Sequence, residues 1–204
     1  MMDISNPDNS NFNNEFDFPQ IMGILNTTPD SFSDGGMYYE TDKAVQKAFQ
    51  LIDDGADIID IGGESTRPGA KSVSVDEELN RTIPVIQKIR DKNKDIILSI
   101  DTTKYEVAKE AAIAGVNLIN DISGLHHDVR LAQIAAEYNL GLIIMHIKGQ
   151  PENMQKEPIY EDLLKEVYDY LNNGIKTANE LGVQKVLIDV GIGFGKTYQH
   201  NIEL

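Results

Sequence analysis

The sequence contains no cysteine and no tryptophan, and basic residues are scarce. The lack of cysteine excludes disulfide bonds and thiolate metal sites, and is compatible with a reducing cytoplasm. Lys and Arg number 18 against 33 Asp and Glu, so the net charge is −15 and neither nucleic acid nor an anionic membrane is an expected partner. No apolar run approaches the ~20 residues of a membrane-spanning helix, and no secretory signal is recognisable. We therefore expect a cytoplasmic protein.

Two segments place dense polar side chains directly after a short apolar stretch. The first reads IMGILNTTPDSFSDGG at residues 21–36, and the second reads IIDIGGESTRPG at residues 58–69. A buried strand that ends in a cluster of side-chain oxygens is typical of the site of an α/β enzyme. An enzyme is therefore the leading interpretation of the sequence.

The rest of the chain alternates apolar and amphipathic segments. Residues 1–18 are rich in Asn and Asp without periodicity, so we expect a disordered lead-in before a domain at 19–204. Apolar runs predict strands at 21–25, 58–61, 96–100, 116–120, 142–146 and 186–188. Amphipathic stretches predict helices at 41–53, 75–93, 104–114, 128–138 and 159–181. Gly55, Gly115 and Gly182 each follow a helix where a left-handed cap is expected.

This pattern is a βα repeat, which fits either a TIM (β/α)₈ barrel or a doubly wound parallel sheet. Polar residues follow every predicted strand, whereas a doubly wound sheet concentrates its site at one switch point. These strand-end residues are Asn26, Glu64, Asp101, Asn120, His146 and Asp189. We therefore favour the barrel, of which about six βα units are present.

Asp101, Asn120 and Asp189 are the strongest candidates for ligand binding. An ionised carboxylate accepts two hydrogen bonds side by side, which suits a flat heterocycle with N–H donors. Each residue could instead cap the helix that follows it. Their shared position at strand ends favours the functional interpretation.

Weaker candidates lie on the neighbouring loops. The amide oxygen of Asn26 is a suitable ligand for Mg²⁺, although an Asx turn before Pro29 would also explain it. Thr66 and Arg67 offer a hydroxyl and a guanidinium to an anion, although an isolated surface Arg is common.

Other residues at the ends of later strands have ordinary structural explanations. Met145 and Phe194 are core residues by default, but near a barrel mouth they could enclose a ring. A lone His146 is more often structural than a metal ligand. The stretch GIGFGKT at 191–197 lacks the spacing of a Walker phosphate loop, so it is a weak nucleotide motif.

Several motifs of the sequence resemble those of the dihydropteroate synthase family, pterin-binding (β/α)₈ enzymes of folate biosynthesis. Two signatures carry the resemblance, GILNTTPDSFSDGG at 23–36 and GADIIDIGGESTRPG at 55–69. The segments SIDTTK, INDISG, MH and DVGIGFGK, which begin at residues 99, 119, 145 and 189, are also similar. The resemblance covers about residues 20–204 and implies a transferase that joins 6-hydroxymethyl-7,8-dihydropterin diphosphate to 4-aminobenzoate.

The resemblance also implies roles for individual residues. The pterin edge would be held by Asp101, Asn120 and Asp189, in a slot lined by Met145 and Phe194 with Lys196 nearby. Asn26 would bind the Mg²⁺ that carries the diphosphate, and Thr66 would contact that diphosphate. Two mobile loops would supply further residues, of which Asp34 would stabilise a cationic intermediate: Phe32, Asp34, Arg67 and Pro68. A homodimer is the oligomer expected from the resemblance.

The sequence departs from the family pattern in two respects. Val190 replaces the proline that usually follows the pterin-binding aspartate, so Asp189 should be less rigidly oriented. Basic residues of the family's last two βα units have no counterpart before Leu204, so we expect a barrel incomplete at its C-terminus. Two alternatives therefore stay open: an inactive truncated pterin-binding paralogue and a cobalamin-dependent pterin methyltransferase.

Overall fold

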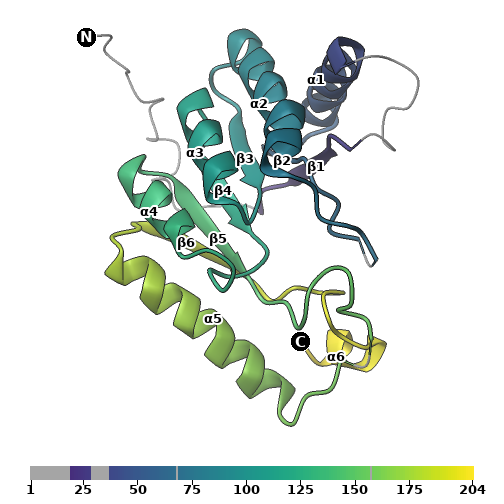
Figure 1. Ribbon diagram of the computed structural model, residues 1–204, viewed down its shortest axis with the longest axis vertical. Coiled ribbons are helices and arrows are strands. Elements are labelled where there is room, and N and C mark those ends of the chain that lie inside the picture. Colours follow the sequence, from purple (N-terminus) through teal and green to yellow (C-terminus); the bar gives the residue numbers. More distant parts are fainter. Residues whose placement is uncertain (1–18, 29–36, 68, 157) are drawn as a thin grey trace.

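The computed structural model describes residues 19–28, 37–67, 69–156 and 158–204 of the chain. Within these ranges strands and helices alternate along the whole sequence (Figure 1). The strands are β1 (Met22–Asn26), β2 (Ile58–Gly62), β3 (Ile97–Asp101), β4 (Leu118–Asp121), β5 (Gly141–Met145) and β6 (Lys185–Asp189). The helices are α1 (Met37–Asp53), α2 (Val75–Lys92), α3 (Tyr105–Ala114), α4 (Arg130–Glu137), α5 (Leu163–Glu180) and α6 (Tyr198–Glu203).

The strands form one parallel, six-stranded sheet in the order β1-β2-β3-β4-β5-β6. A doubly wound sheet would reverse direction at a switch point, whereas here each new strand is added on the same side. Helices α1 to α5 follow one another along the sheet in chain order (Figure 1). Among the described residues β1 and β6 are the edges. The predicted barrel winding with six βα units is confirmed, and the doubly wound alternative is excluded.

Local sequence signals explain where the helices begin and end. The Ser74 hydroxyl accepts a hydrogen bond from the Glu77 amide at 3.2 Å and thereby caps the start of α2. The three predicted glycine caps have positive φ, at 104° for Gly55, 100° for Gly115 and 89° for Gly182. These glycines therefore let the chain leave a helix and enter the next strand, as the sequence predicted.

The two faces of the sheet bury different side chains. On the helix-facing side the central strands contribute fully buried residues, including Ile59, Ile61, Leu98 and Ile100. Burial of each such side chain stabilises the fold by about 1.5–3 kcal/mol. The inner face carries a smaller apolar layer made of Met22, Ile58, Ile97, Leu118, Ile143 and Leu187. None of the described helices is long and apolar enough to span a bilayer.

Candidate active site

The alternation of side chains along the strands brings the predicted site residues to the inner face. Successive residues of a strand point to opposite faces, and residues level with each other on neighbouring strands share a face. Gly62 is level with both Asn26 and Asp101, and Asp101 is level with Asn120. Met145 is level with Asp189. Five predicted residues therefore share the inner face, toward the C-terminal ends of the strands: Asn26, Asp101, Asn120, Met145 and Asp189.

Asp60 lies next to the candidate site residues but is not among those predicted from the sequence. It lies in the middle of β2 with a relative exposure of 2%, and its carboxylate accepts a hydrogen bond from the Asn120 amide at 2.9 Å. Burial raises the pKa of Asp60. Its signal in the sequence is a single carboxylate within the apolar run 58–61, a run that by itself predicts only a strand. Asp60 therefore orients the amide of Asn120 from within the sheet.

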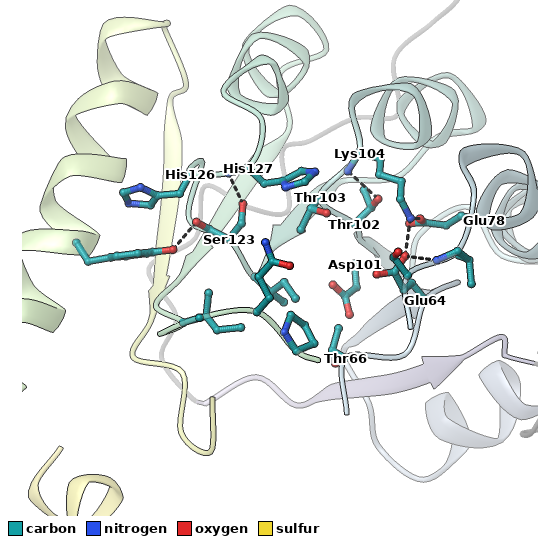
Figure 2. A pocket seen from close by; sticks show the side chains of 18 residues that line it. Glu64, Thr66, Glu78, Asp101, Thr102, Thr103, Lys104, Ser123, His126 and His127 are labelled. Atoms are coloured by element: carbon teal, nitrogen blue, oxygen red, sulfur yellow. Dashed lines mark hydrogen bonds and ion pairs between the residues drawn. The ribbon is translucent and has the colours of Figure 1, made fainter. Parts of the chain in front are cut away.

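A cavity of about 410 Å³ opens above the ends of β2, β3 and β4. Figure 2 shows Asp101 and Thr66 facing it, together with Glu64, Lys104 and Ser123. Of the predicted site residues in the described part of the chain, only Thr66 and Asp101 line this cavity. The structure therefore places these two residues at a shared opening.

Asp101 is surrounded by negative charge. Its pKa is raised well above the usual value, by burial first and then by the nearby carboxylates of Asp60, Glu78, Asp121 and Glu64. A carboxylate at the edge of a cavity in such surroundings gains from a ligand that donates hydrogen bonds to it. This is the environment expected of a functional group.

Lys104 supplies positive charge beside these carboxylates. Its ammonium lies 2.6 Å from the Glu64 carboxylate and also pairs with Glu78, which is 1% exposed. Neither Lys104 nor Glu78 is predictable as a site residue, because nothing in their spacing shows that β2, α2 and α3 meet there. The sequence motif SIDTTK contains the lysine, and that was the available signal.

The loop after β2 carries Thr66 and Arg67. Thr66 lines the cavity, and Arg67 is exposed. The loop contacts the segment after β5, because the Gly69 amide donates to the Pro151 carbonyl at 3.1 Å. Loops from two separated strands thus meet over the same end of the sheet.

Asp189 is held by the main chain of the glycine-rich loop that follows β6. Its carboxylate accepts a hydrogen bond from the Gly191 amide at 2.8 Å, and its carbonyl accepts one from the His146 amide at 2.9 Å. Val190 packs against the principal apolar core. These contacts orient Asp189 although proline is absent at the next position.

Lys196 is directed inward rather than toward the cavity. It is 3% exposed, and its ammonium donates to the carbonyls of Gly191 at 2.8 Å and Phe194 at 3.0 Å. The ammonium also lies 2.8 Å from the Nδ1 atom of His146. Burial lowers the pKa of Lys196 to about 8. In this structure Lys196 therefore organises the loop that carries Asp189 and Phe194.

Met145 and Phe194 belong to one apolar contact group. Buried Met145 belongs to a small apolar cluster with Ile122, Ile147 and Met154, and Phe194 packs against it. Ile122 and Ile147 also line the cavity. The cluster therefore forms the apolar flank of the cavity, on the side toward β6.

Asn26 ends β1 with an exposed side chain. Among residues that the structure describes, no group of three or more His, Asp or Glu side chains is arranged to hold a metal ion. Mg²⁺ nevertheless often binds through one or two protein oxygens plus phosphate oxygens. An accessible amide oxygen at this position fits that arrangement. The residues Phe32, Asp34 and Pro68, like the lead-in at 1–18, lie outside the described part of the chain.

Comparison with known proteins gives consistent matches. The sequence profile of the pterin binding enzyme family matches residues 22–204. The chain is 51% identical over 184 residues to dihydropteroate synthase of Bacillus subtilis, covering 89% of this chain and 62% of that protein. It is 47% identical over 186 residues to dihydropteroate synthase of Synechocystis, covering 90% and 64%. The chain thus spans just under two thirds of the length of these relatives.

A solved structure supports the same relationship. Xanthomonas albilineans dihydropteroate synthase with 4-aminobenzoic acid superposes with a TM-score of 0.83 at 41% identity. The match covers 92% of this chain and 66% of that one. Sequence and structure therefore indicate the same family.

Proposed function

The chain belongs to the pterin-binding enzyme family, and from this premise we propose that it acts as a dihydropteroate synthase. The reaction would join 6-hydroxymethyl-7,8-dihydropterin diphosphate to 4-aminobenzoate, releasing diphosphate and forming 7,8-dihydropteroate. The observation that carries the proposal is the shared face of Asp101, Asn120 and Asp189 at one end of the sheet. A cytoplasmic location and a homodimer belong to the same proposal.

In this proposal the inner-face residues recognise the pterin. Asp101 and Asp189 accept hydrogen bonds from the pterin N–H groups, and Asn120, oriented by Asp60 at 2.9 Å, offers its amide. Met145 and Phe194 line the slot, because they pack together beside the cavity. Lys196 supports that slot through the carbonyls of Gly191 and Phe194.

The reacting carbon is the methylene of the pterin. Its C–O bond to diphosphate breaks, a C–N bond to the amine forms, and the amine loses one proton to solvent. Asp34 stabilises the positive charge that develops on the methylene. Thr66 holds the diphosphate, while Arg67, Phe32 and Pro68 form the aminobenzoate pocket and exclude water.

Asn26 is the residue that would hold Mg²⁺, together with oxygens of the substrate. Bound Mg²⁺ would neutralise part of the charge on the departing diphosphate. Mg²⁺ often binds through one or two protein oxygens plus phosphate oxygens, so we expect the ion to bind together with the diphosphate rather than before it.

The first test replaces Asp189 by Asn. Calorimetric titration with 6-hydroxymethyl-7,8-dihydropterin should show binding that weakens about tenfold or more, because a charged acceptor becomes a group that both donates and accepts. Asp169→Asn, which breaks an exposed pair with Lys165, is the matched control. Equal affinities for the Asp189 variant and the original chain would refute the assigned role. Pterin binding without formation of dihydropteroate would favour the inactive paralogue.

A second test addresses the metal. Asn26→Ala should lower the affinity for diphosphate measured with Mg²⁺, while the affinity measured in EDTA stays the same. The expected reason is the loss of the one amide oxygen available to the ion at the end of β1. Diphosphate binding that is identical with and without Mg²⁺ in the unmodified chain would exclude this role.

A further inference from the structure

One ammonium group joins three elements beside the cavity. Lys104 immediately precedes α3, Glu64 follows β2, and Glu78 lies in the first turn of α2. The Lys104 Nζ atom lies 2.6 Å from the Glu64 carboxylate and donates to the Glu78 carboxylate as well. Figure 2 shows the lysine reaching both carboxylates above Asp101.

Glu64 makes a second contact that closes a loop. The same carboxylate oxygen that pairs with Lys104 accepts a hydrogen bond from the Val73 amide at 2.9 Å. Glu64 and Val73 stand at the two ends of the segment 65–72, which carries Thr66 and Arg67. One side chain therefore joins the base of the loop, and Lys104 fixes that side chain to the barrel.

We propose that Glu64 and Lys104 are positioning residues that clamp the loop 65–72 over the cavity. The inference rests on the proposed function, in which Thr66 and Arg67 of this loop contact diphosphate and aminobenzoate. Neither clamp residue is required to touch a substrate. Their effect is to restrict the loop so that its hydroxyl and guanidinium are already placed when the substrates bind.

The charge balance explains why the clamp depends on the lysine. Burial opposes the charge of Lys104, but the hydrogen bonds that the lysine donates to Glu64 and Glu78, with the charges of these carboxylates, outweigh burial and raise the lysine pKa. One oxygen of the buried Glu78 carboxylate has no hydrogen-bond partner among the described residues. Removal of the ammonium would leave two carboxylates facing each other at short range. Glu64 would then turn away toward solvent and release the Val73 amide.

Limited trypsin digestion tests the clamp without reference to any activity. Lys71 is exposed within the loop, whereas the bond after Arg67 precedes proline and resists trypsin. Glu64→Ala should increase the rate of cleavage after Lys71 about tenfold, the factor for losing a charge-assisted hydrogen bond. Lys88→Met is the control, because it breaks an ion pair of 2.7 Å between α2 and Asp42 of α1, away from the cavity.

A second variant guards against general unfolding. Lys104→Met alone leaves buried Glu78 unpaired, so the double variant Lys104→Met/Glu78→Gln removes one charge of each sign. We expect faster cleavage after Lys71 in this variant, with unchanged cleavage at the other sites that both chains share. Cleavage after Lys71 at the original rate in both this variant and Glu64→Ala would overturn the clamp.

Substrate kinetics separate positioning from simple structural support. The clamp predicts a KM for 4-aminobenzoate that rises about fivefold to tenfold. The affinity for 6-hydroxymethyl-7,8-dihydropterin should stay unchanged, because this compound lacks the diphosphate and its proposed ligands lie outside the loop. An equal loss of affinity for this diphosphate-free pterin would indicate general damage and would count against positioning. Absence of pterin binding in the unmodified chain would reject the proposed function instead, while the trypsin result would still decide whether the loop is clamped.

Discussion

At the scale of single residues, His146 and Lys196 form a buried pair in which the histidine is the acceptor. His146 is 3% exposed, and its Nδ1 atom lies 2.8 Å from the lysine ammonium. An ammonium has no lone pair, so Nδ1 must be unprotonated and Nε2 must carry the hydrogen. Burial, with the charge of Lys196, lowers the pKa of His146 to about 4. The neutral ring is therefore part of the folded structure.

Because of this pair, the free energy of unfolding depends on pH. The ordinary pKa of His146 in the unfolded chain is 6.5 and the folded value is about 4. Between these values the unfolded state binds more protons, so the free energy of unfolding falls as pH decreases from 6.5 to 4. In His146→Gln, an amide oxygen can accept from Lys196 without titrating. From pH 7 to pH 4.5 this variant should lose about 2 kcal/mol less than the original chain.

Urea denaturation of both proteins at the two pH values measures this difference. Carboxylates with altered pKa values also titrate in this range, but they are common to both proteins and cancel. His127→Gln changes an exposed histidine and serves as the control. Parallel pH profiles for His146→Gln and the original chain would show that the buried ring does not govern acid stability.

The residues that could be predicted from the sequence were those that end a strand. Asp101, Asn120 and Asp189 were identifiable because the carboxyl ends of parallel strands meet at one edge. Asp60 and Glu78 were missed for a physical reason, since their roles depend on contacts between elements distant in sequence. For Lys196 the motif was recognisable from the sequence, but the direction of the side chain was not. That direction is set by hydrogen bonds to backbone carbonyls.

At the scale of elements, the glycine-rich segment after β6 allows two stretches of main chain to pack closely. A Cβ atom at Gly195 would lie 2.3 Å from the Lys148 carbonyl oxygen, and one at Gly191 would lie 1.9 Å from that of His146. The segment therefore passes directly against the main chain that follows β5. The Tyr160 hydroxyl fixes it further by donating to the Gly195 carbonyl at 2.7 Å.

Two glycines of this segment provide a matched pair of substitutions. Gly193 and Gly195 both have positive φ, at 85° and 65°, but a Cβ atom at Gly193 would meet nothing within 4 Å. Gly193→Ala should destabilise by only about 1 kcal/mol, the cost of an alanine in this conformation. In Gly195→Ala the added methyl group must also displace the loop. This variant should therefore lose about 3 kcal/mol of unfolding free energy in total.

Urea titrations give both values, and pterin titration should show weaker binding for Gly195→Ala because the loop also carries Asp189. Similar losses of stability for the two alanine variants would show that the close approach to Lys148 is not needed.

The order of strands and helices was predictable from hydrophobic period alone, since alternation of buried runs and amphipathic stretches is a local property. The close packing of this loop against the segment after β5 was not predictable, because it depends on contacts between parts of the chain that are distant in sequence.

At the scale of the whole molecule, two features oppose each other. The net charge of −15 produces a repulsion that opposes association of two copies of the chain. The described sheet, however, has edges at β1 and β6, and an unpaired strand edge is a template for another chain. Each edge strand also carries an apolar side chain that is largely exposed, 56% for Ile24 and 57% for Ile188.

The ionic strength should determine whether charge repulsion or pairing of the sheet edges dominates. The screening length falls from about 10 Å at 0.1 M salt to about 3 Å at 1 M, so self-association of the chain should increase with ionic strength. Ile24→Lys/Ile188→Lys should suppress that increase in light scattering, because a lysine on an edge strand hinders strand pairing. Ile113→Lys, at a helix position with 54% exposure, is the control. If Ile113→Lys suppresses association equally, added charge rather than the sheet edge is responsible.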